Sequence, residues 1–312
     1  MNIKETKIKF KKNEINKIEF VNSMHNLHSV LFDFSENLRN TEISKIEIED
    51  GQVIFTSRKT ELHPGGAKFY IDVLDKRITP VEAFNFNMYE QEDSEMLYKL
   101  VDSDDVIFDI GANIGWYSNH LSKKNPNSVI YAFEPIPETF NKVKRNTELN
   151  KVNNIHLNNV ALSNKIETLT FFYSPNVTGA SSSINITENE NMLKLECQTN
   201  TIDNFIKEKN ISKLDFIKCD VEGAELMVFL GGEESINKYK PIVFSEMLRK
   251  WAAKFGYHPN EIITFFDKLG YKCYVNKNHK LKLIEKIDED TVETNFFFLH
   301  PIKHADKIKK LG

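Results

Sequence analysis

The fold of this chain is decided by the stretch Val106-Ile-Phe-Asp-Ile-Gly-Ala-Asn-Ile-Gly-Trp-Tyr-Ser118. Its first five residues, Val106–Ile110, are apolar apart from Asp109, which predicts a short buried strand. Gly111 and Gly115 then bound a tight turn, and the residues after it continue like a helix. A buried strand that turns at glycines into a helix is typical of the nucleotide-binding part of a parallel α/β sheet.

The chain on both sides of this stretch alternates short apolar segments with segments of helical periodicity. We expect further strands at residues 128–133, 155–161, 169–173, 214–219, 242–245 and 295–299, and helices after Pro135 and over residues 261–269. Strands separated by helices indicate a mostly parallel sheet with helices on both faces. The predicted fold class is therefore α/β and Rossmann-like. Residues 174–200 are polar and are expected to form a long recognition loop.

Residues 1–80 have a different pattern and are predicted to form a small α+β region ahead of a main domain over residues 81–312. An apolar face with steps of 4, 3, 4, 3 and 4 consists of Phe20, Met24, Leu27, Leu31, Phe34 and Leu38. This spacing predicts an amphipathic helix that packs on its own domain, with a short seam in a homodimer as the alternative. An Asp50-Gly51 turn between alternating segments predicts a hairpin, and residues 67–73 read as another strand.

Composition excludes several classes of protein. The chain has 312 residues, 40% hydrophobic and 28% charged, with a net charge of -4, which is ordinary for a globular protein. The absence of a basic field argues against a nucleic-acid partner. No apolar run is long enough to span a membrane and no signal-peptide pattern is present, so we expect a cytoplasmic protein. Cys197, Cys219 and Cys273 are scattered, as in proteins with reduced thiols.

The turn at Gly111-Ala112-Asn113-Ile114-Gly115 discriminates between nucleotides. Asn113 stands where a dinucleotide fingerprint has its second glycine, and Asp109 places a carboxylate where phosphates would be repelled. Both features favour S-adenosylmethionine, which is cationic and has no phosphate. Glu134 follows Gly115 by 19 residues, a spacing that predicts hydrogen bonds to ribose hydroxyls. A dinucleotide-dependent oxidoreductase is the alternative, although no Tyr-x-x-x-Lys donor follows.

A second acidic cluster is predicted at the same edge of the sheet. Asp220, Glu222 and Glu225 follow the strand at 214–219, and Glu246 ends the strand at 242–245. The carboxyl ends of parallel strands meet at one edge, where such sheets bind ligands. Carboxylates gathered there repel each other unless a cationic ligand, a metal or shared protons intervene.

These motifs in this order resemble the FkbM-type methyltransferases over about residues 81–300. They are Asp109-x-Gly-Ala-Asn-x-Gly, Phe133-Glu134-Pro135, Val160-Ala161-Leu162, Asp220-Val-Glu-Gly-Ala-Glu225 and Glu246, with Asn85-Phe-x-x-x-Tyr89-Glu90 upstream. The resemblance implies a class I methyltransferase with a seven-stranded sheet, often one that methylates a hydroxyl of a sugar, glycolipid or natural product. The implied cofactor residues are Asp109, Gly111, Ala112, Asn113, Gly115, Glu134, Val160, Ala161 and Asp220. The chain departs from the pattern at Asn164, where an acid is expected.

A sugar hydroxyl needs a positioned base, and we expect Asp220 or Glu246 to be that base, with Glu222 orienting it. A divalent metal at Asp220 is not favoured because no histidine joins the acids at ligand spacing. His258 is an alternative acceptor contact or base. The expected partner is a small-molecule or glycan acceptor. A module that binds S-adenosylmethionine without turnover is the alternative from another class of protein.

Overall fold

The computed structural model describes residues 2–61, 63–188 and 191–312. Within these residues, the largest element is an eight-stranded sheet with strand order β13-β12-β14-β11-β10-β4-β5-β6. Its strands are β4 (Val106–Ile110), β5 (Val129–Phe133), β6 (Ile155–Asn158), β10 (Phe216–Cys219), β11 (Ile242–Glu246), β12 (Lys272–Lys277), β13 (Lys280–Ile284) and β14 (Asn295–Leu299).

The sheet confirms the predicted Rossmann-like α/β class. β6, β5, β4, β10 and β11 run parallel, and β14 is inserted antiparallel between β11 and β12. Six of these strands were expected from the sequence, whereas β12 was not, and β13 forms a hairpin with β12, so the sheet has one strand more than the seven that the family resemblance implies. The strand order reverses between β4 and β10. β5 and β6 follow on one side of β4, and the chain then crosses over to place β10 and β11 on the other side of β4. Ligands of such sheets bind at this switch point.

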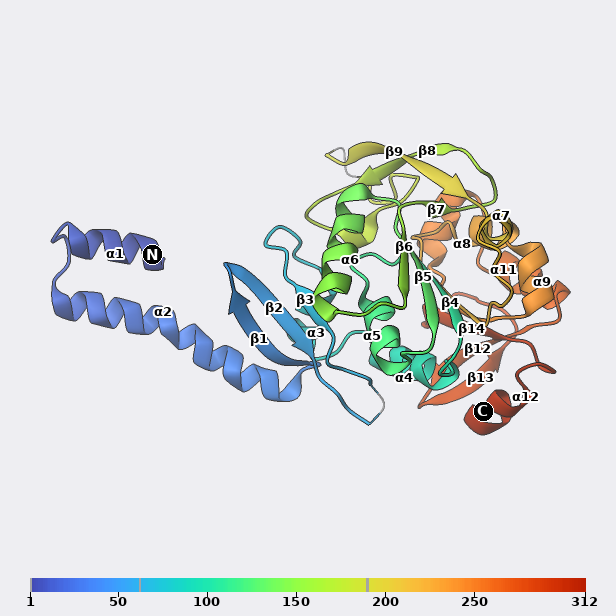
Figure 1. Cartoon of the computed structure of the whole chain (residues 1–312), viewed down its shortest axis with the longest axis horizontal. Helices are drawn as coiled ribbons and strands as arrows, with labels where there is room; N and C mark the ends of the chain where they lie inside the picture. Colours follow the sequence, from blue (N-terminus) through green and yellow to red (C-terminus); the bar gives the residue numbers. More distant parts are fainter. Residues whose placement is uncertain (1, 62, 189–190) are drawn as a thin grey trace.

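Helices cover both faces of the sheet (Figure 1). Phe108 and Ile110 face one hydrophobic core with the apolar sides of α7, α8, α9 and α11, whereas Ile107 faces a second core with α3, α4 and α5. No helix among the described residues is long and apolar enough to cross a membrane. The bounds are α3 (Thr79–Asn85), α4 (Gln91–Leu100), α5 (Trp116–Lys124), α6 (Pro137–Asn150), α7 (Ile202–Glu208), α8 (Glu225–Leu230), α9 (Glu233–Tyr239), α10 (Arg249–Ala252), α11 (Asn260–Lys268) and α12 (Ala305–Leu311), with 3-10 turns at Leu38–Asn40, Thr178–Ala180 and Ala253–Phe255.

Two expectations about the middle of the chain are corrected. The strand predicted at 169–173 is β8 (Thr168–Tyr173), which lies outside the main sheet in a three-stranded sheet of order β7-β9-β8. The loop predicted over 174–200 ends in the strand β9 (Leu193–Asn200), which pairs antiparallel with β8. β9 alternates apolar and polar residues, and this period of two was hidden by its polar composition. β7 is Ala161–Leu162.

The N-terminal part contains the predicted helix and hairpin. α2 (Lys17–Asn37) is preceded by a short helix that the sequence did not predict, α1 (Ile3–Lys11), and the two form a helical hairpin that projects from the body (Figure 1). β1 (Ile43–Glu49) and β2 (Gln52–Ser57) form the hairpin at Asp50 and Gly51, whose φ angles of 49° and 74° fit that turn, and β3 (Lys68–Tyr70) joins β2.

The boundary near residue 80 stays a prediction, but the residues on its two sides share one core. Ile43, Phe55 and Phe69 pack in the same cluster as Leu97 of α4 and Trp116 of α5. The strands β1 to β3 therefore pack into the core on one face of the main sheet, whereas the helices α1 and α2 project away from the body (Figure 1).

Candidate cofactor-binding and active site

A cavity of about 350 Å³ opens where β4, β5, β10 and β11 end, which is the edge that the sequence predicts. Its size is in the range of small-molecule sites. Eight of the predicted site residues line it, namely Gly111, Asn113, Glu134, Val160, Ala161, Asp220, Glu222 and Glu246. The strand ends thus bring together residues that are more than a hundred positions apart in the chain.

The glycine turn forms the floor of this cavity. Gly111 has a φ of 74°, and a Cβ atom built there would lie 1.8 Å from the carbonyl oxygen of Asp220. Only glycine therefore lets the turn after β4 approach the turn after β10 so closely. Gly115 has a φ of 81° and starts α5, and Asn113 lies between them with a φ of 49°. The turn is held to β5, because the backbone N–H groups of Gly111 and Ala112 donate to the Phe133 carbonyl at 3.1 and 2.9 Å.

Glu134 extends from the end of β5 into the cavity wall. Its Oε2 atom accepts from the Asn113 backbone N–H and its Oε1 atom from the Ile136 backbone N–H, each at 3.0 Å. Burial raises the pKa of this carboxyl to about 7, although both hydrogen bonds act in the opposite direction. The side chain is thereby fixed beside the glycine turn, with lone pairs left to accept from a ligand.

Asp109 lies beneath the cavity and not in its wall. Its side chain is only 1% exposed; Oδ2 accepts from the Ser118 hydroxyl, and Oδ1 lies 3.7 Å from the Nζ atom of Lys218. Ala112 and Gly115 also lie behind the lining residues. This geometry does not provide direct contact between the Asp109 carboxylate and the methionine ammonium group of a bound cofactor. The role of Asp109 at the cofactor stays a prediction.

Lys218 is a residue next to the cavity that the sequence did not single out. Its side chain is buried, and Nζ donates to the Gly111 carbonyl at 2.9 Å and to Asp220 Oδ2 at 3.3 Å. It thus connects the glycine turn, the buried Asp109 and the cavity-lining Asp220. Asp220 and Asp109 lead the interactions that raise the pKa of Lys218 against the effect of burial, so the ammonium group stays charged. The missed signal is the register of the sheet, in which Lys218 of β10 lies directly beside Asp109 of β4.

Asp220, Glu222 and Glu246 converge in the cavity. Each can place one carboxylate oxygen within 4.8 Å of the other two. Burial, followed by the charges of Asp220 and Glu222, raises the pKa of Glu246 to about 10. Burial and then Asp220 also raise the pKa of Glu222. The cluster therefore retains protons at neutral pH, and Asp220 is the member that has the cation of Lys218 beside it.

Hydrogen bonds with Glu225 and Tyr257 hold the turn that carries Asp220 and Glu222. Glu225 Oε1 accepts from the backbone N–H groups of Val221 and Gly223 at 3.1 Å, and the Tyr257 hydroxyl donates to the Gly223 carbonyl at 2.9 Å. Glu222 has a φ of 55°, so this support maintains a left-handed residue in the site. Tyr257 is buried and does not line the cavity.

His258 is not part of the site. Its side chain is exposed, it does not line the cavity, and its Nδ1 atom accepts from the Asn260 backbone N–H at the start of α11. Trp251, by contrast, lines the cavity together with Leu248 and Lys250.

Further lining residues come from the motif that ends at Tyr89 and Glu90 and from segments without a motif. Tyr89 and Glu90 lie in the turn before α4, where Glu90 has a φ of 44° and accepts from the Tyr117 hydroxyl at 2.8 Å. Thr178 comes from the polar segment after β8, and its hydroxyl donates to the buried Asp75 at 2.5 Å. The lining residues that the sequence did not single out include Arg77, Thr79, Glu82, Thr178, Ser181, Ser183 and Lys250.

Comparison with known proteins places this chain in a family. The model of the methyltransferase FkbM domain matches residues 109–273, which is more than half of the chain. The chain belongs to the methyltransferase FkbM domain family. The matched range begins at Asp109, contains the glycine turn, and includes Asp220, Glu222 and Glu246.

Three curated relatives of this FkbM-family chain each match less than half of it. It is 30% identical over 145 residues to Methyltransferase 1 of Beauveria bassiana, a match that covers 41% of this chain and 58% of the relative. It is 30% identical over 142 residues to the hexuronic acid methyltransferase AglP of Haloferax volcanii, covering 46% and 56%. It is 27% identical over 148 residues to the 2-O-methyltransferase NoeI of Sinorhizobium fredii, covering 43% and 60%. Each match thus spans less than two thirds of the relative.

A solved structure of Methyltransferase FkbM from Methylobacillus flagellatus KT aligns with a TM-score of 0.41 and 16% identity, covering 70% of this chain and 53% of that one.

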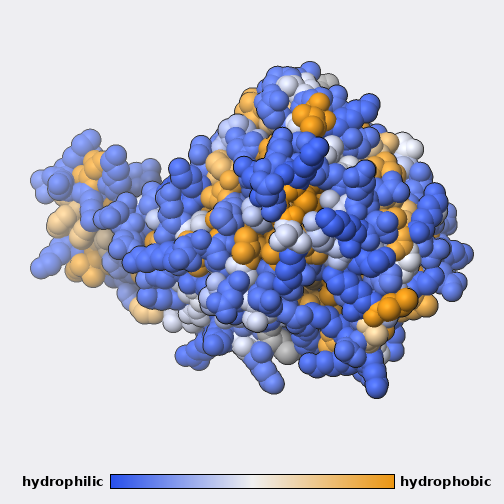
Figure 2. Space-filling model, turned by 45° about the vertical axis from the view of Figure 1, so that its right-hand side comes forward, coloured by the Kyte–Doolittle hydropathy of each residue, from blue (hydrophilic) through white to orange (hydrophobic). Residues whose placement is uncertain are grey.

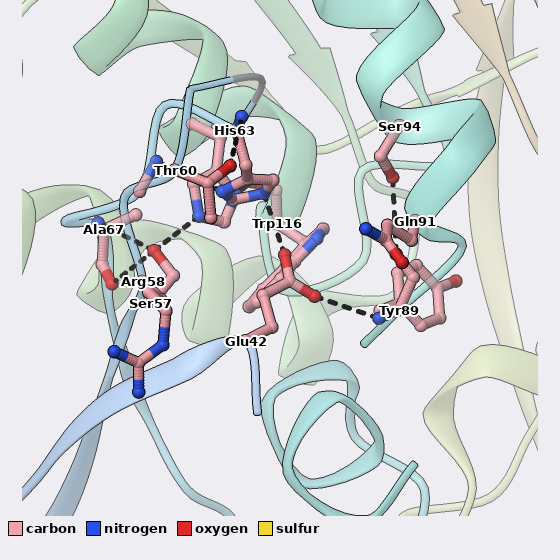
Figure 3. A network of polar contacts seen from close by, with 12 residues as sticks. Glu42, Ser57, Arg58, Thr60, His63, Ala67, Tyr89, Gln91, Ser94 and Trp116 are labelled. Carbon is pink, nitrogen blue, oxygen red and sulfur yellow. Dashed lines mark hydrogen bonds and ion pairs between the residues drawn. The ribbon is translucent and has the colours of Figure 1, made fainter. Parts of the chain in front are cut away.

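The segment that carries Tyr89 and Glu90 lies outside the FkbM match and is held by the N-terminal region. Glu42, just before β1, has Oε1 at 2.8 Å from His63 Nε2, and its Oε2 atom accepts from the Tyr89 backbone N–H at 2.9 Å. Figure 3 shows Glu42 between these two residues. Both Glu42 and His63 are buried, so water competes little with these contacts. Residues before 80 thus support part of the cavity wall.

Proposed function

We propose that this chain is an S-adenosylmethionine-dependent O-methyltransferase whose acceptor is a hydroxyl of a sugar, glycan, glycolipid or natural product. The observation that carries the proposal is the convergence of Asp220, Glu222 and Glu246 within 4.8 Å beside the glycine turn at Gly111. That arrangement supplies a proton acceptor next to the place where a nucleoside cofactor binds in this type of sheet.

The charge of the cavity supports a cationic cofactor. Six carboxyl groups line it against two cationic side chains, Arg77 and Lys250. Glu222 and Glu246 hold protons at neutral pH, but the carboxyl groups that remain ionised still favour a sulfonium or ammonium group over the pyrophosphate of a dinucleotide. The carboxyl groups are those of Glu82, Glu90, Glu134, Asp220, Glu222 and Glu246.

The residues present fit S-adenosylmethionine part by part. Glu134 offers acceptor lone pairs for ribose hydroxyls, and Gly111 lets the backbone approach the methionine part. Val160, Ala161 and Leu162 provide an apolar wall for the adenine ring. Asp109 acts from below through Lys218, which holds the turn at Gly111. When bound, the cofactor supplies an activated methyl group on its sulfonium.

Asp220 is the base in this proposal. Glu246 and Glu222 hold protons at neutral pH, since the pKa of each is raised, whereas Asp220 lies 3.3 Å from the Lys218 ammonium. Asp220 accepts the proton of the acceptor hydroxyl as the oxygen–methyl bond forms and the sulfur–methyl bond breaks. Protonated Glu246 and Glu222 can donate hydrogen bonds that orient the acceptor and Asp220. A positioned base of this kind contributes about 10²- to 10⁴-fold in rate.

The acceptor class is proposed from the relatives and the cavity wall together. Two of the relatives are named for a hexuronic acid and for 2-O-methylation. In this chain Trp251 presents an aromatic surface in the cavity wall, and aromatic rings bind the apolar faces of sugar rings. Neighbouring hydroxyl groups of Thr79, Ser181 and Ser183 line the same cavity and can hydrogen-bond an acceptor.

The test is transfer of a labelled methyl group from S-adenosylmethionine to a panel of free sugars, uronic acids and nucleotide sugars. We expect Asp220→Asn to lower kcat by about 100-fold or more, because the isosteric amide cannot accept the proton. The control is Asp290→Asn, which removes an exposed carboxylate in the loop before β14. Turnover by Asp220→Asn at the wild-type rate would contradict the base assignment. Turnover is also predicted to survive EDTA, and its loss would place a metal in the acidic cluster.

A further inference from the structure

The hairpin formed by α1 and α2 leaves an apolar face without a partner. This face consists of the six apolar residues that lie on one side of α2 and the following turn, and none of the residues of α2 is buried. The six are Phe20, Met24, Leu27, Leu31, Phe34 and Leu38. Phe10 of α1 stacks on Phe20 at 4.3 Å, and Phe84 of the body contacts Phe34 at 5.3 Å. Leu31, between these two covers, remains 56% exposed. α1 and the body therefore cover the ends of this face and leave its middle open.

Exposed apolar side chains are concentrated in this part of the molecule. Of the twenty large apolar side chains that are exposed among the described residues, nine belong to the first 34 residues. Figure 2 shows apolar atoms on the projecting hairpin. The nine are Ile3, Ile8, Phe10, Ile18, Val21, Val30, Leu31, Phe32 and Phe34. On α2, Leu31 and Phe34 belong to the apolar face and the other exposed apolar residues lie on other sides of the helix. Most of the stability of a protein helix comes from burying apolar side chains, so the hairpin is short of packing as a single copy.

Its charges are separated along its length. Residues 4–17, at the far end of the hairpin, contain six lysines and two glutamates. The other end of α2 carries Asp33 and Glu36, and its last turn has no basic residue. Arg39 of the following turn and Arg58, whose guanidinium donates to the Leu38 carbonyl, also lie at this end of α2. Among the described residues, neither Asp33 nor Glu36 nor any of these lysines forms an ion pair within the chain.

We propose that this hairpin is a self-association surface that joins two copies of the chain in an antiparallel arrangement. A two-fold axis near the middle of α2 places the basic far end of each hairpin beside Asp33 and Glu36 of the other. The same arrangement places the exposed Leu31 of each copy against the middle of the other copy's α2, close to Met24 and Leu27. Both the apolar exposure and the charge separation are thus satisfied by one partner, a second copy.

The acids at the base of the hairpin favour this occupant over a lipid surface. A membrane-binding amphipathic helix carries lysines along its polar face and inserts apolar residues between anionic headgroups. Here Asp33 and Glu36 flank Leu31 and Phe34, so that half of the hairpin would be repelled. The lysines lie at one end of the hairpin only. This distribution is better matched by the acidic end of a second hairpin than by a lipid surface that is negatively charged throughout.

The surface is small, so the association is expected to depend on concentration. α2 has 21 residues and α1 has 9. At 1.5 Å per residue and about 10 Å of width per helix, the two faces present roughly 450 Å² per copy, or roughly 900 Å² in total. Interfaces of that size are at the weak end of specific association. We expect dissociation in the micromolar range.

Sedimentation velocity of the full chain over about 1 to 200 µM tests the proposal. Wild type is expected to shift from monomer to dimer across this range. Leu31→Glu is expected to weaken the dimer at least about tenfold, because the charge enters the interface from both copies. The matched control is Ile166→Glu, which adds the same charge to an apolar residue that is 62% exposed and far from the hairpin in sequence. A wild type that stays monomeric throughout, or a Leu31→Glu dimer as strong as that of Ile166→Glu, overturns the proposal.

A charge exchange tests the antiparallel arrangement separately. Asp33→Lys with Glu36→Lys, or Lys9→Glu with Lys12→Glu, is expected to weaken the dimer at low salt, and combining all four to restore it. A combined variant no stronger than either pair overturns the arrangement. Flotation with vesicles of neutral and of anionic lipid tests the other occupant. Vesicle binding lost in Leu31→Glu, without dimerisation in solution, overturns the proposal in favour of a membrane surface, whereas no vesicle binding supports it.

Discussion

Replacement of Lys218 by methionine tests whether this residue holds the site together. The change shortens the unbranched side chain by one atom and removes its charge. Lys218 is 4% exposed and Asp109 is 1% exposed, so the carboxylate of Asp109 loses its cation in a place where water cannot replace it. Breaking a buried pair from one side costs about 3–5 kcal/mol. The separation of 3.7 Å is long for an ion pair, and the Asp220 partner is 31% exposed, so we expect the lower end, about 3 kcal/mol.

The assay is equilibrium unfolding in urea, with the free energy of unfolding obtained by linear extrapolation. The control is Lys213→Met, whose lysine is 43% exposed and contacts Asp104 and Asp215. An exposed pair of this kind contributes no more than about 1 kcal/mol. The double variant Lys218→Met with Asp109→Asn is expected to recover much of the loss, because no unpaired buried charge remains. A loss below about 1 kcal/mol for Lys218→Met, or no recovery in the double variant, would refute this reasoning.

Three further changes have expected outcomes. Gly111→Ala is expected to lower the free energy of unfolding by about 2–4 kcal/mol and to weaken cofactor binding, since its Cβ atom would lie 1.8 Å from the Asp220 carbonyl oxygen. Glu42→Gln is expected to cost about 1–3 kcal/mol in urea unfolding and to lower kcat for methyl transfer, because the support of Tyr89 loses its buried charge. Burial raises the pKa of Glu134 to about 7, so the folded protein holds a proton that the unfolded chain loses near pH 4.5. Its contribution to stability therefore falls as pH rises from about 4.5 to 7, by roughly 3 kcal/mol, and Glu134→Gln is expected to remove this part of the pH dependence in unfolding measured from pH 5 to 8.

Each of these changes has a comparison that isolates its cause. Gly51 also has a φ of 74° but no atom within 4 Å of an added Cβ, so Gly51→Ala carries the backbone strain alone. Equal losses for the two glycine variants would show that the close approach at Gly111 does not matter. Glu148→Gln changes an exposed glutamate on α6 and should keep the wild-type pH dependence. If Glu42→Gln lowers stability but leaves kcat unchanged, the N-terminal region supports the fold and not the site.

The sequence predicted features that depend on neighbouring residues and on regular apolar spacing. The strand at Val106–Ile110 and the turn at Gly111 follow from residue type, and the hairpin at Asp50 follows from its turn chemistry. The grouping of Asp220 with Glu246 could also be predicted, because both stand at the carboxyl ends of strands and parallel order places those ends together.

What the sequence did not show depends on pairing between distant segments. Lys218 faces Asp109 only because β10 aligns with β4 in one register, and a shift of one residue would point it to the other side of the sheet. Glu90 reaches the cavity through a left-handed turn that its residue type does not favour. β9 is polar on one face, so its composition predicts a loop. It forms a strand because it pairs with β8, and that pairing is not visible in the sequence.

Isothermal titration of the purified chain with S-adenosylmethionine, S-adenosylhomocysteine and NAD tests the central claim, that the acidic cavity binds a sulfonium nucleoside. We expect the first two to bind with micromolar affinity at a single site, Glu134→Ala to abolish that binding, Glu148→Ala to leave it unchanged, and NAD not to bind. Binding of NAD in preference to S-adenosylmethionine, or no binding of either S-adenosyl compound, would contradict the account of the cavity and the methyltransferase proposal with it.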